Sequence, residues 1–174
     1  MKRQPPKGET IYRERRFELR RCRIPLRGGG FQERGLIIHP GAVVLIPILD
    51  DGRVALIRNH RWQVGKHLLE LPAGTMEVVE VPIICAAREL EEETGYRAEH
   101  LEAWTPFYPL PGGSTEVMYP FVARGLTWVG QRLEPDEEIT VHPKTIDEIR
   151  DLLETGSLED GKSIAMLGRY LLVR

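Results

Sequence analysis

Apolar and polar positions alternate along the first part of the chain, a pattern typical of strands with one exposed face. From Ile11 to Leu26 the period is mainly 2, with a change of phase that predicts a bend or a bulge. Residues 31–39 predict another strand. Residues 43–49 form a nearly continuous aliphatic run, which predicts a strand buried on both faces. The turn at residues 50–52 predicts a hairpin that leads into the next strand.

The spacing changes to a helical period in the second half of the chain. The first predicted helix has Pro82 in its first turn and Gly95 just past its end. A second helix covers residues 145–153, with Thr145 as its N-cap, and a third covers residues 163–172. Further short strands are predicted at residues 103–108, 117–123, 128–133 and 138–142. Helices on both faces of a mixed sheet are the layering that this order supports, so the predicted fold class is α/β.

The composition is that of an ordinary single globular domain, since 41% of the 174 residues are hydrophobic and 29% are charged. No apolar run approaches the length of a membrane span, and the N-terminal residues lack the apolar core of a secretory signal. Cys22 and Cys85 are too few for a disulfide framework or a zinc site. We therefore expect a cytoplasmic protein without a membrane partner, in which Cys85 belongs to the core.

Positive charge is concentrated at the N-terminus, although the net charge is only −2. Residues 1–38 carry 11 Lys or Arg against 4 Asp or Glu, a balance of +7. A basic segment can mark a nucleic-acid surface. Here the arginines alternate with glutamates and apolar residues, which indicates strands with charged outer faces and argues against nucleic acid as a partner. A contact between subunits, or attraction of an anionic substrate, fits the segment better.

The first helix carries a cluster of glutamates. At about 100° per residue, Glu89, Glu92 and Glu93 fall within one arc of the helix. Like charges at this spacing repel, and a divalent cation would turn the repulsion into coordination. A solvated acidic face is the simpler alternative. The apolar residues predicted on the opposite side are Ile83, Ile84, Ala87 and Leu90.

The residues around these glutamates complete a recognisable pattern. It consists of Gly74, Glu80 after five residues, and after seven more Arg88-Glu89-Leu90-x-Glu92-Glu93-x-Gly95-Tyr96. With every fixed position of the Nudix box filled, the sequence resembles the Nudix hydrolases. Many relatives have Gly before the first Glu of the box, where this chain has Val79. The resemblance implies an α/β/α sandwich with a mixed sheet over residues 39–174, preceded by an N-terminal tail and β extension over residues 1–38.

The resemblance also implies a metal site. Glu89 and Glu93 match the residues that bind Mg²⁺ in Nudix enzymes, where Mn²⁺ can replace it, and Glu92 matches a neighbouring or bridging ligand. The backbone carbonyl of Ala73 is a further implied ligand. The resemblance implies that Arg88 pairs with a box carboxylate, with Glu80 as the favoured partner. For this pair we favour a role in shaping the site over contact with the reacting phosphorus.

A loop downstream resembles bacterial ADP-ribose pyrophosphatases more narrowly. Pro111 stands 15 positions after Tyr96, as the proline of that subfamily does, and Gly112 and Gly113 follow it. The resemblance makes Glu116 the residue that orients or deprotonates the attacking water. Gly112 and Gly113 are then candidate substrate-binding residues, on a loop that closes over the substrate. An ordinary Pro-Gly hairpin with an exposed Glu is the alternative. Many relatives have Ser where this chain has Leu110.

The segment Arg58-Asn-His-Arg61-Trp62 resembles the R-Q-x-R segment of the same subfamily. It makes Arg58 and Arg61 candidate substrate contacts, and Arg61 could pair with a phosphate. Trp62 could stack on a base, although packing, for example at a dimer interface, is the favoured role.

These features predict a Mg²⁺-dependent hydrolase that cleaves the diphosphate of a nucleoside diphosphate sugar, first of all ADP-ribose to AMP and ribose 5-phosphate. A Nudix hydrolase for FAD, NADH or GDP-mannose is the alternative within the class. A non-catalytic nucleotide- or RNA-binding module is the alternative outside it, but it would be expected to have lost box glutamates. Similar ADP-ribose pyrophosphatases are dimers with an exchanged N-terminal region. Residues 11–38 are therefore expected to pack across a partner subunit and to contribute to its pocket.

Overall fold

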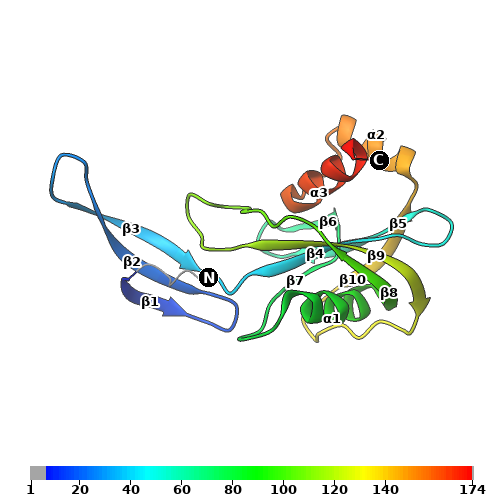
Figure 1. The fold of residues 1–174 in the computed structure, drawn as a ribbon, viewed down its shortest axis with the longest axis horizontal. Helices are drawn as coiled ribbons and strands as arrows, with labels where there is room; N and C mark the ends of the chain where they lie inside the picture. Colours follow the sequence, from blue (N-terminus) through cyan, green and yellow to red (C-terminus); the bar gives the residue numbers. More distant parts are fainter. Residues whose placement is uncertain (1–6, 174) are drawn as a thin grey trace.

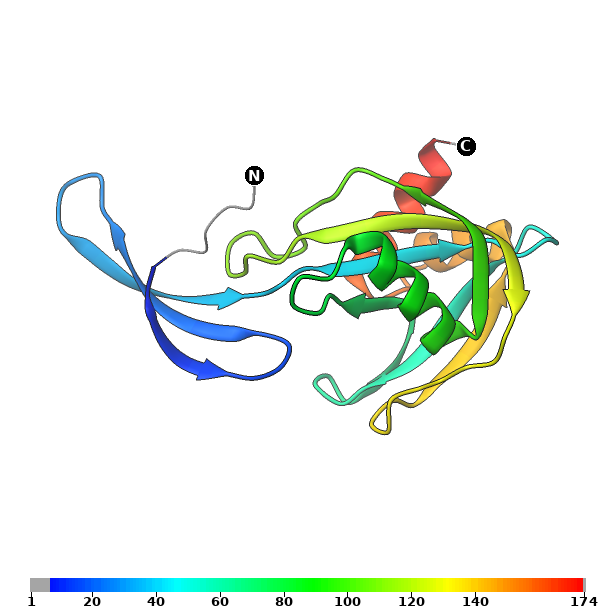
Figure 2. The same cartoon turned by 60° about the horizontal axis from the view of Figure 1, so that its bottom comes forward.

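The computed structural model describes residues 7–173, so the predicted tail is described only from Lys7. Its first three strands form a separate antiparallel sheet that projects from the rest of the chain (Figures 1 and 2). They are β1 (Glu9–Arg13), β2 (Glu18–Pro25) and β3 (Phe31–Ile38). The irregularity predicted between Leu19 and Cys22 is wrong in place, because β2 pairs with β3 in unbroken register from Glu18 to Pro25. The shift of register lies in β1 instead, between Thr10 and Tyr12.

The remaining elements form a layered body (Figure 1). They are β4 (Ala42–Pro47), β5 (Val54–Arg61), β6 (Lys66–Glu70), β7 (Ala73–Thr75), α1 (Pro82–Thr94), β8 (Tyr96–Ala103), β9 (Met118–Trp128), β10 (Ile139–Lys144), α2 (Ile146–Glu154) and α3 (Gly161–Leu172). One sheet has the order β7-β4-β9-β8 with β4 and β9 parallel, and the other has the order β10-β5-β6. Helix α1 lies on one side of the strands and α2 and α3 lie on the other, which confirms the predicted α/β/α sandwich with mixed pairing.

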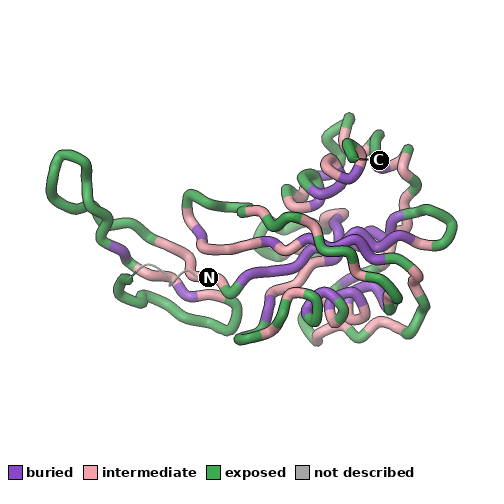
Figure 3. Tube along the Cα trace, viewed as in Figure 1, coloured by how far each residue is buried: buried purple, intermediate pink, exposed green. Residues whose placement is uncertain are grey.

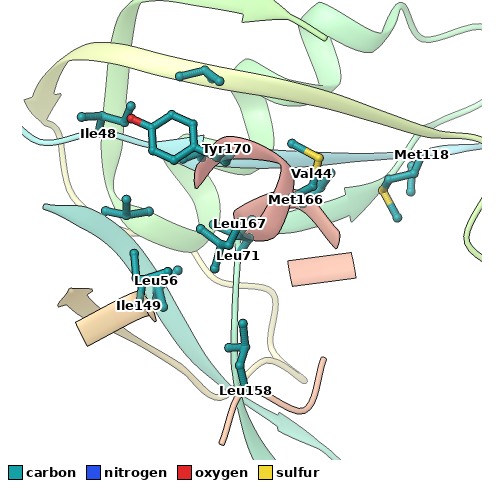
Figure 4. Packing of buried hydrophobic residues seen from close by; sticks show 14 residues of the cluster. Val44, Ile48, Leu56, Leu71, Met118, Ile149, Leu158, Met166, Leu167 and Tyr170 are labelled. Atoms are coloured by element: carbon teal, nitrogen blue, oxygen red, sulfur yellow. The ribbon is translucent and has the colours of Figure 1, made fainter. Parts of the chain in front are cut away.

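Strand β4 is the centre of the core and is buried on both faces, as predicted. Val43 and Leu45 pack on the side of α1, against Cys85 and Leu90 among others. The alternate residues of β4, such as Val44, point to the other side and pack with α3 (Figure 4). Figure 3 shows burial concentrated along this strand and its neighbours, whereas the N-terminal sheet is largely exposed.

Helix α1 is turned differently from the prediction. Ile83, Ile84 and Ala87 were expected in the core, but they are exposed. Of the predicted apolar side, only Leu90 is buried. The inner side of the helix carries Cys85, Ala86, Leu90, Glu89 and Glu93. The carboxylates therefore face β7 rather than solvent, and the solvated acidic face is wrong.

Two of the short strands were also predicted wrongly. Residues 104–108 lie outside the strands apart from one bridge at Phe107, and residues 129–138 form a loop. Strand β10 and the cap of α2 are confirmed. Thr145 accepts a hydrogen bond from the backbone of Glu148, whose side chain accepts one from the backbone of Thr145. No helix in residues 7–173 has the length and apolar character needed to cross a membrane.

Val79 lies in the turn that leads into α1, and its φ is 65°. The turn is closed by a hydrogen bond of 3.1 Å from the Glu80 amide to the Glu77 carbonyl. A left-handed conformation is a strain for a β-branched residue and free of strain for Gly. The chain therefore keeps a glycine-type turn at the position where it departs from its relatives.

We predict that Val79→Gly stabilises the protein by about 1 kcal/mol. The substitution relieves about 1–2 kcal/mol of backbone strain in the folded state. The greater conformational entropy of Gly in the unfolded chain costs about 0.5–1 kcal/mol, which is less. Val78→Gly is the matched control, since Val78 is equally exposed but its φ is not positive, and it should be destabilising. Urea unfolding measures both variants. Equal destabilisation by the two substitutions would show that Val79 is not strained.

Candidate active site

A cleft of about 550 Å³ lies where the inner side of α1 meets β7. Its lining comes from α1, β7 and the turn between them, and also from the β1–β2 turn, β5, the loop after β9 and the start of α3. This volume is within the range of about 300–1,000 Å³ typical of small-molecule sites. The cleft therefore brings together segments from both ends of the chain.

Gly74 allows Glu89 to enter the cleft. A Cβ atom at Gly74 would lie 1.8 Å from the carboxyl carbon of Glu89, so any side chain there would force this carboxylate to move. The backbone amide of Ala73 donates a 2.8 Å hydrogen bond to Glu93. Both carboxylates thus lie directly against the backbone of β7, and any residue but Gly at the box position would expel Glu89.

Burial raises the pKa of both carboxyls. Glu89 is 8% exposed and Glu93 is 3% exposed. Loss of solvation, partly offset by the charge of Arg88, raises the pKa of Glu89 to about 7. Loss of solvation and then repulsion by Glu89 raise the pKa of Glu93 to about 8. Such a pair has an excess of buried negative potential that a bound cation would relieve.

Arg88 links the box residues as the sequence predicted, and makes further contacts. Its Nε donates to Glu80 at 3.1 Å, and its Nη2 donates to the second oxygen of Glu80 at 3.2 Å. Its Nη1 donates to Glu89 at 2.7 Å and to Glu92 at 2.9 Å. Glu80 also accepts a hydrogen bond from the amide of Glu77, so Arg88 and Glu80 join the turn to the helix.

The donor atoms suit a hard divalent cation, because carboxylate and carbonyl oxygens are the preferred ligands of such ions. Within residues 7–173, however, no group of acidic, His or Cys side chains is already gathered as a metal cluster. Arg88 bridges Glu89 and Glu92 instead. A cation that used these two carboxylates would have to replace the guanidinium between them.

Glu116 lines the cleft, whereas Gly112 and Gly113 are not among the lining residues that the structure describes. The loop is joined to β3, since the Ile37 amide donates to the Gly113 carbonyl and the Thr115 amide donates to the Ile37 carbonyl, both at 2.9 Å. This part of the loop is held in place by the N-terminal sheet.

The residues of the Arg58–Trp62 segment lie in different places in the structure. Arg61 lines the cleft and makes a two-pronged contact with Glu70, at 2.8 Å and 2.6 Å. Arg58 borders a separate, smaller cleft on the outer side of β6. Trp62 lies at the β5–β6 turn and is 76% exposed. In the described part of the chain, neither Arg58 nor Trp62 lines the main cleft.

Several lining residues were missed in the sequence. Arg15 and Arg16 reach the cleft of their own chain from the β1–β2 turn, and both pair with Glu134, at 2.9 Å and 3.6 Å. Glu137 lies near enough to raise the pKa of Glu89 and Glu93. The acidic run from Glu134 to Glu138 between two predicted strands was the available signal for this loop.

Buried carboxylates beside cationic side chains, in a cleft between packed layers, are the arrangement of an enzyme that binds an anionic substrate with a divalent cation. The family model described as NUDIX domain matches residues 38–167, so the chain belongs to this family and is a Nudix hydrolase. Hydrolases of this family generally need a divalent metal ion.

Relatives and a solved structure agree with this assignment. The chain is 34% identical to the ADP-ribose pyrophosphatase of Bacillus subtilis over 80% of this chain and 77% of the relative. It is 32% identical to the methanol dehydrogenase activator of Bacillus methanolicus over 91% of this chain and 86% of the relative. A solved structure described as an ADP compounds hydrolase has a TM-score of 0.80 at 24% identity, covering 97% of this chain and 95% of the other, and it shows the same fold.

The raised pKa values predict a loss of stability with rising pH in metal-free protein. As pH rises through about 4.5, the unfolded chain releases protons that folded Glu89 and Glu93 still hold, so the free energy of unfolding falls until about pH 8. Glu93→Gln should therefore be more stable than wild type by about 2–4 kcal/mol at pH 8 and almost equal at pH 4.5.

Urea unfolding in EDTA at the two pH values measures this difference. Glu154→Gln, at an exposed position of α2, is the control and should follow wild type. Addition of Mg²⁺ at pH 8 should stabilise wild type more than Glu93→Gln. The same pH dependence in wild type and Glu93→Gln would contradict the burial of Glu93.

Proposed function

We propose that the protein hydrolyses the diphosphate linkage of ADP-ribose to AMP and ribose 5-phosphate, with Mg²⁺ as the cofactor and Mn²⁺ as a substitute. The observation that carries this proposal is the buried pair Glu89 and Glu93 in a cleft that also contains Arg15, Arg16 and Arg61. The name of the Bacillus subtilis relative supports the choice of substrate. The unpaired thiols Cys22 and Cys85 agree with a place in the cytoplasm.

In the proposed reaction, Glu89, Glu93, Glu92 and the carbonyl of Ala73 would hold the metal ion. A bound divalent ion neutralises the diphosphate and stabilises the charge that develops on the attacked phosphoryl group. Arg61, which lines the cleft, would contact a phosphate with the part of its guanidinium that is not bound to Glu70. Arg88 and Glu80 set the position of Glu89 and the turn before α1, and neither touches the reacting phosphorus.

The water-activating base is proposed to be a carboxylate of the cleft. Glu116 is the candidate from the sequence, and it lies near enough to His39 to oppose the fall in the pKa of that side chain, which loss of solvation lowers. Glu137 is the candidate from the structure, because its negative charge raises the pKa of both Glu89 and Glu93. Proximity to the metal-binding pair favours Glu137.

Hydrolysis of a panel tests the substrate. ADP-ribose should have the highest kcat/KM among ADP-ribose, FAD, NADH, GDP-mannose and 8-oxo-dGTP, and EDTA should abolish the reaction. Glu93→Gln should lower kcat at least about 100-fold, because it removes a metal ligand without removing volume. A tenfold preference for another compound would overturn the substrate, and full activity in EDTA would overturn the metal dependence.

Paired substitutions test the base. Substitution of the base by Gln should lower kcat about 10²–10⁴-fold and change KM little, because a base acts in the transition state. We expect this loss for Glu137→Gln and a loss below about tenfold for Glu116→Gln. The reverse order would return the role to Glu116, and two active variants would place the base among the box glutamates.

We also propose that the protein is a homodimer in which the sheet β1–β3 packs across a partner subunit. Among the described residues, its exposed apolar side chains are Ile11, Tyr12, Ile24, Leu26 and Phe31. Such a sheet needs a covering layer, and a second copy would supply it. In the single chain the β1–β2 turn reaches its own cleft, and a contribution to the partner's pocket stays a prediction.

Light scattering tests the assembly. Wild type should be a dimer at micromolar concentration, and Phe31→Glu should shift it towards monomer, because a buried unpaired charge costs several kcal/mol. Gln32→Glu, the next residue along β3, is the control and should stay dimeric. A fully active wild-type monomer would defeat the proposal.

A further inference from the structure

Lys162 belongs to the helix on the far side of the body from α1, yet it lines the cleft. It lies in the first turn of α3, and its side chain is 14% exposed. Its ammonium donates hydrogen bonds to Glu70 and, at 3.0 Å, to Asp160. The C-terminal helix, which lies outside the Nudix box, thus delivers a cationic group to the site.

Glu70 is the centre of this contact. Its side chain is 1% exposed, and the Nε and Nη2 of Arg61 donate to its two oxygens while Lys162 donates to one of them. Burial opposes the ionisation of Glu70, but the hydrogen bond from Arg61 and the charge of Lys162 hold its pKa below the ordinary value. An ionised carboxylate at this depth needs both cations.

The start of α3 is fixed firmly enough to hold Lys162 in place. Asp160 caps the helix by accepting a 2.9 Å hydrogen bond from the Ser163 amide. The hydroxyl of Ser163, which is fully buried, accepts a 2.7 Å hydrogen bond from the amide of Leu71, the residue after Glu70. Lys162 therefore lies between the residue that caps α3 and a residue that is bonded to the chain at the end of β6.

The charges of this cluster balance, since Arg61 and Lys162 face Glu70 and Asp160. The cluster as a whole consequently has little net attraction for an anion. Its effect on the cleft is to orient the side chain of Arg61. Arg61 donates hydrogen bonds to Glu70 from Nε and Nη2, so its Nη1 edge is left to bind a ligand.

We propose that Lys162 is a positioning residue of the hydrolytic site, which fixes Glu70 and thereby holds the guanidinium of Arg61 towards the diphosphate of the substrate. The inference rests on the proposed function in taking a diphosphate as the ligand of Arg61. Lys162 itself does not need to touch the substrate.

Kinetics of Lys162→Met test the role. Without the ammonium, the buried Glu70 carboxylate keeps one cationic partner instead of two and is placed less firmly, so it positions Arg61 less well. KM for ADP-ribose should therefore rise about tenfold, the size expected for one weakened charge-assisted hydrogen bond, while kcat changes less than about threefold. Lys162→Arg should restore KM. Lys66→Met is the matched control, because Lys66 pairs with Glu159 at 2.9 Å on the exposed outer face, and its KM should equal that of wild type. An unchanged KM in folded Lys162→Met would overturn the inference.

A double substitution separates positioning from general damage. If Lys162 acts through Arg61, adding Lys162→Met to Arg61→Gln should raise KM no further. Multiplying effects would overturn the inference. If Lys162→Met does not fold, Glu70→Gln takes its place, since it removes the charge that both cations bind and keeps the shape.

A measurement without substrate keeps the inference separate from the proposed function. The Nε–H signal of Arg61 in a ¹H–¹⁵N spectrum, identified by its loss in Arg61→Lys, should exchange with water about tenfold faster in Lys162→Met than in wild type or Lys66→Met. Equal exchange would overturn the inference even if ADP-ribose is hydrolysed. Faster exchange in a protein that hydrolyses no compound of the panel would support the positioning role and reject the proposed function.

Discussion

The close approach of two carboxylates to the backbone of β7 is the constraint on which the site depends. Glu89 fits only because Gly74 has no side chain, and Glu93 is held by the amide of Ala73. The approach removes both groups from water, which raises their pKa and makes two negative charges at this place costly unless a cation is bound. The fold accepts this local cost because β4, next to β7, is surrounded by well-packed apolar side chains on both faces.

Elements determined by local sequence were predictable. The aliphatic run of β4 fixed its burial, and the reciprocal hydrogen bonds of Thr145 and Glu148 fixed the start of α2. The rotation of α1 was not predictable from its apolar residues, because Ile83 and Ile84 would form a regular apolar side in isolation. The observed rotation goes with tertiary contacts, namely the packing of Cys85, Ala86 and Leu90 against β4 and the approach of Glu89 to Gly74. The box pattern identified the residues of this contact but not their depth.

The outer parts of the site depend on contacts between distant segments, which periodicity does not encode. Arg15 meets Glu134 across 119 positions, and Lys162 meets Glu70 across 92. Residues 129–138 show the same difficulty, because the sequence at their start resembles a strand. In the structure, their backbone amides donate hydrogen bonds to the carbonyls of Gly95 and Glu92 at the end of α1. The residues that belong to a sequence motif were recognisable, whereas Arg15, Glu137 and Lys162 were missed because they reach the cleft only when separate elements converge.

Cys85 occupies the inner side of α1, one turn before Glu89, and is fully buried. Burial and then the charges of Glu89 and Glu80 raise the pKa of its thiol well above the ordinary value. Only the thiolate reacts readily with peroxide or alkylating reagents. The same electronegative, water-poor surroundings that favour a cation therefore make the sulfur beside them chemically inert, and hydrolysis should continue under oxidative conditions that inactivate enzymes with a reactive cysteine.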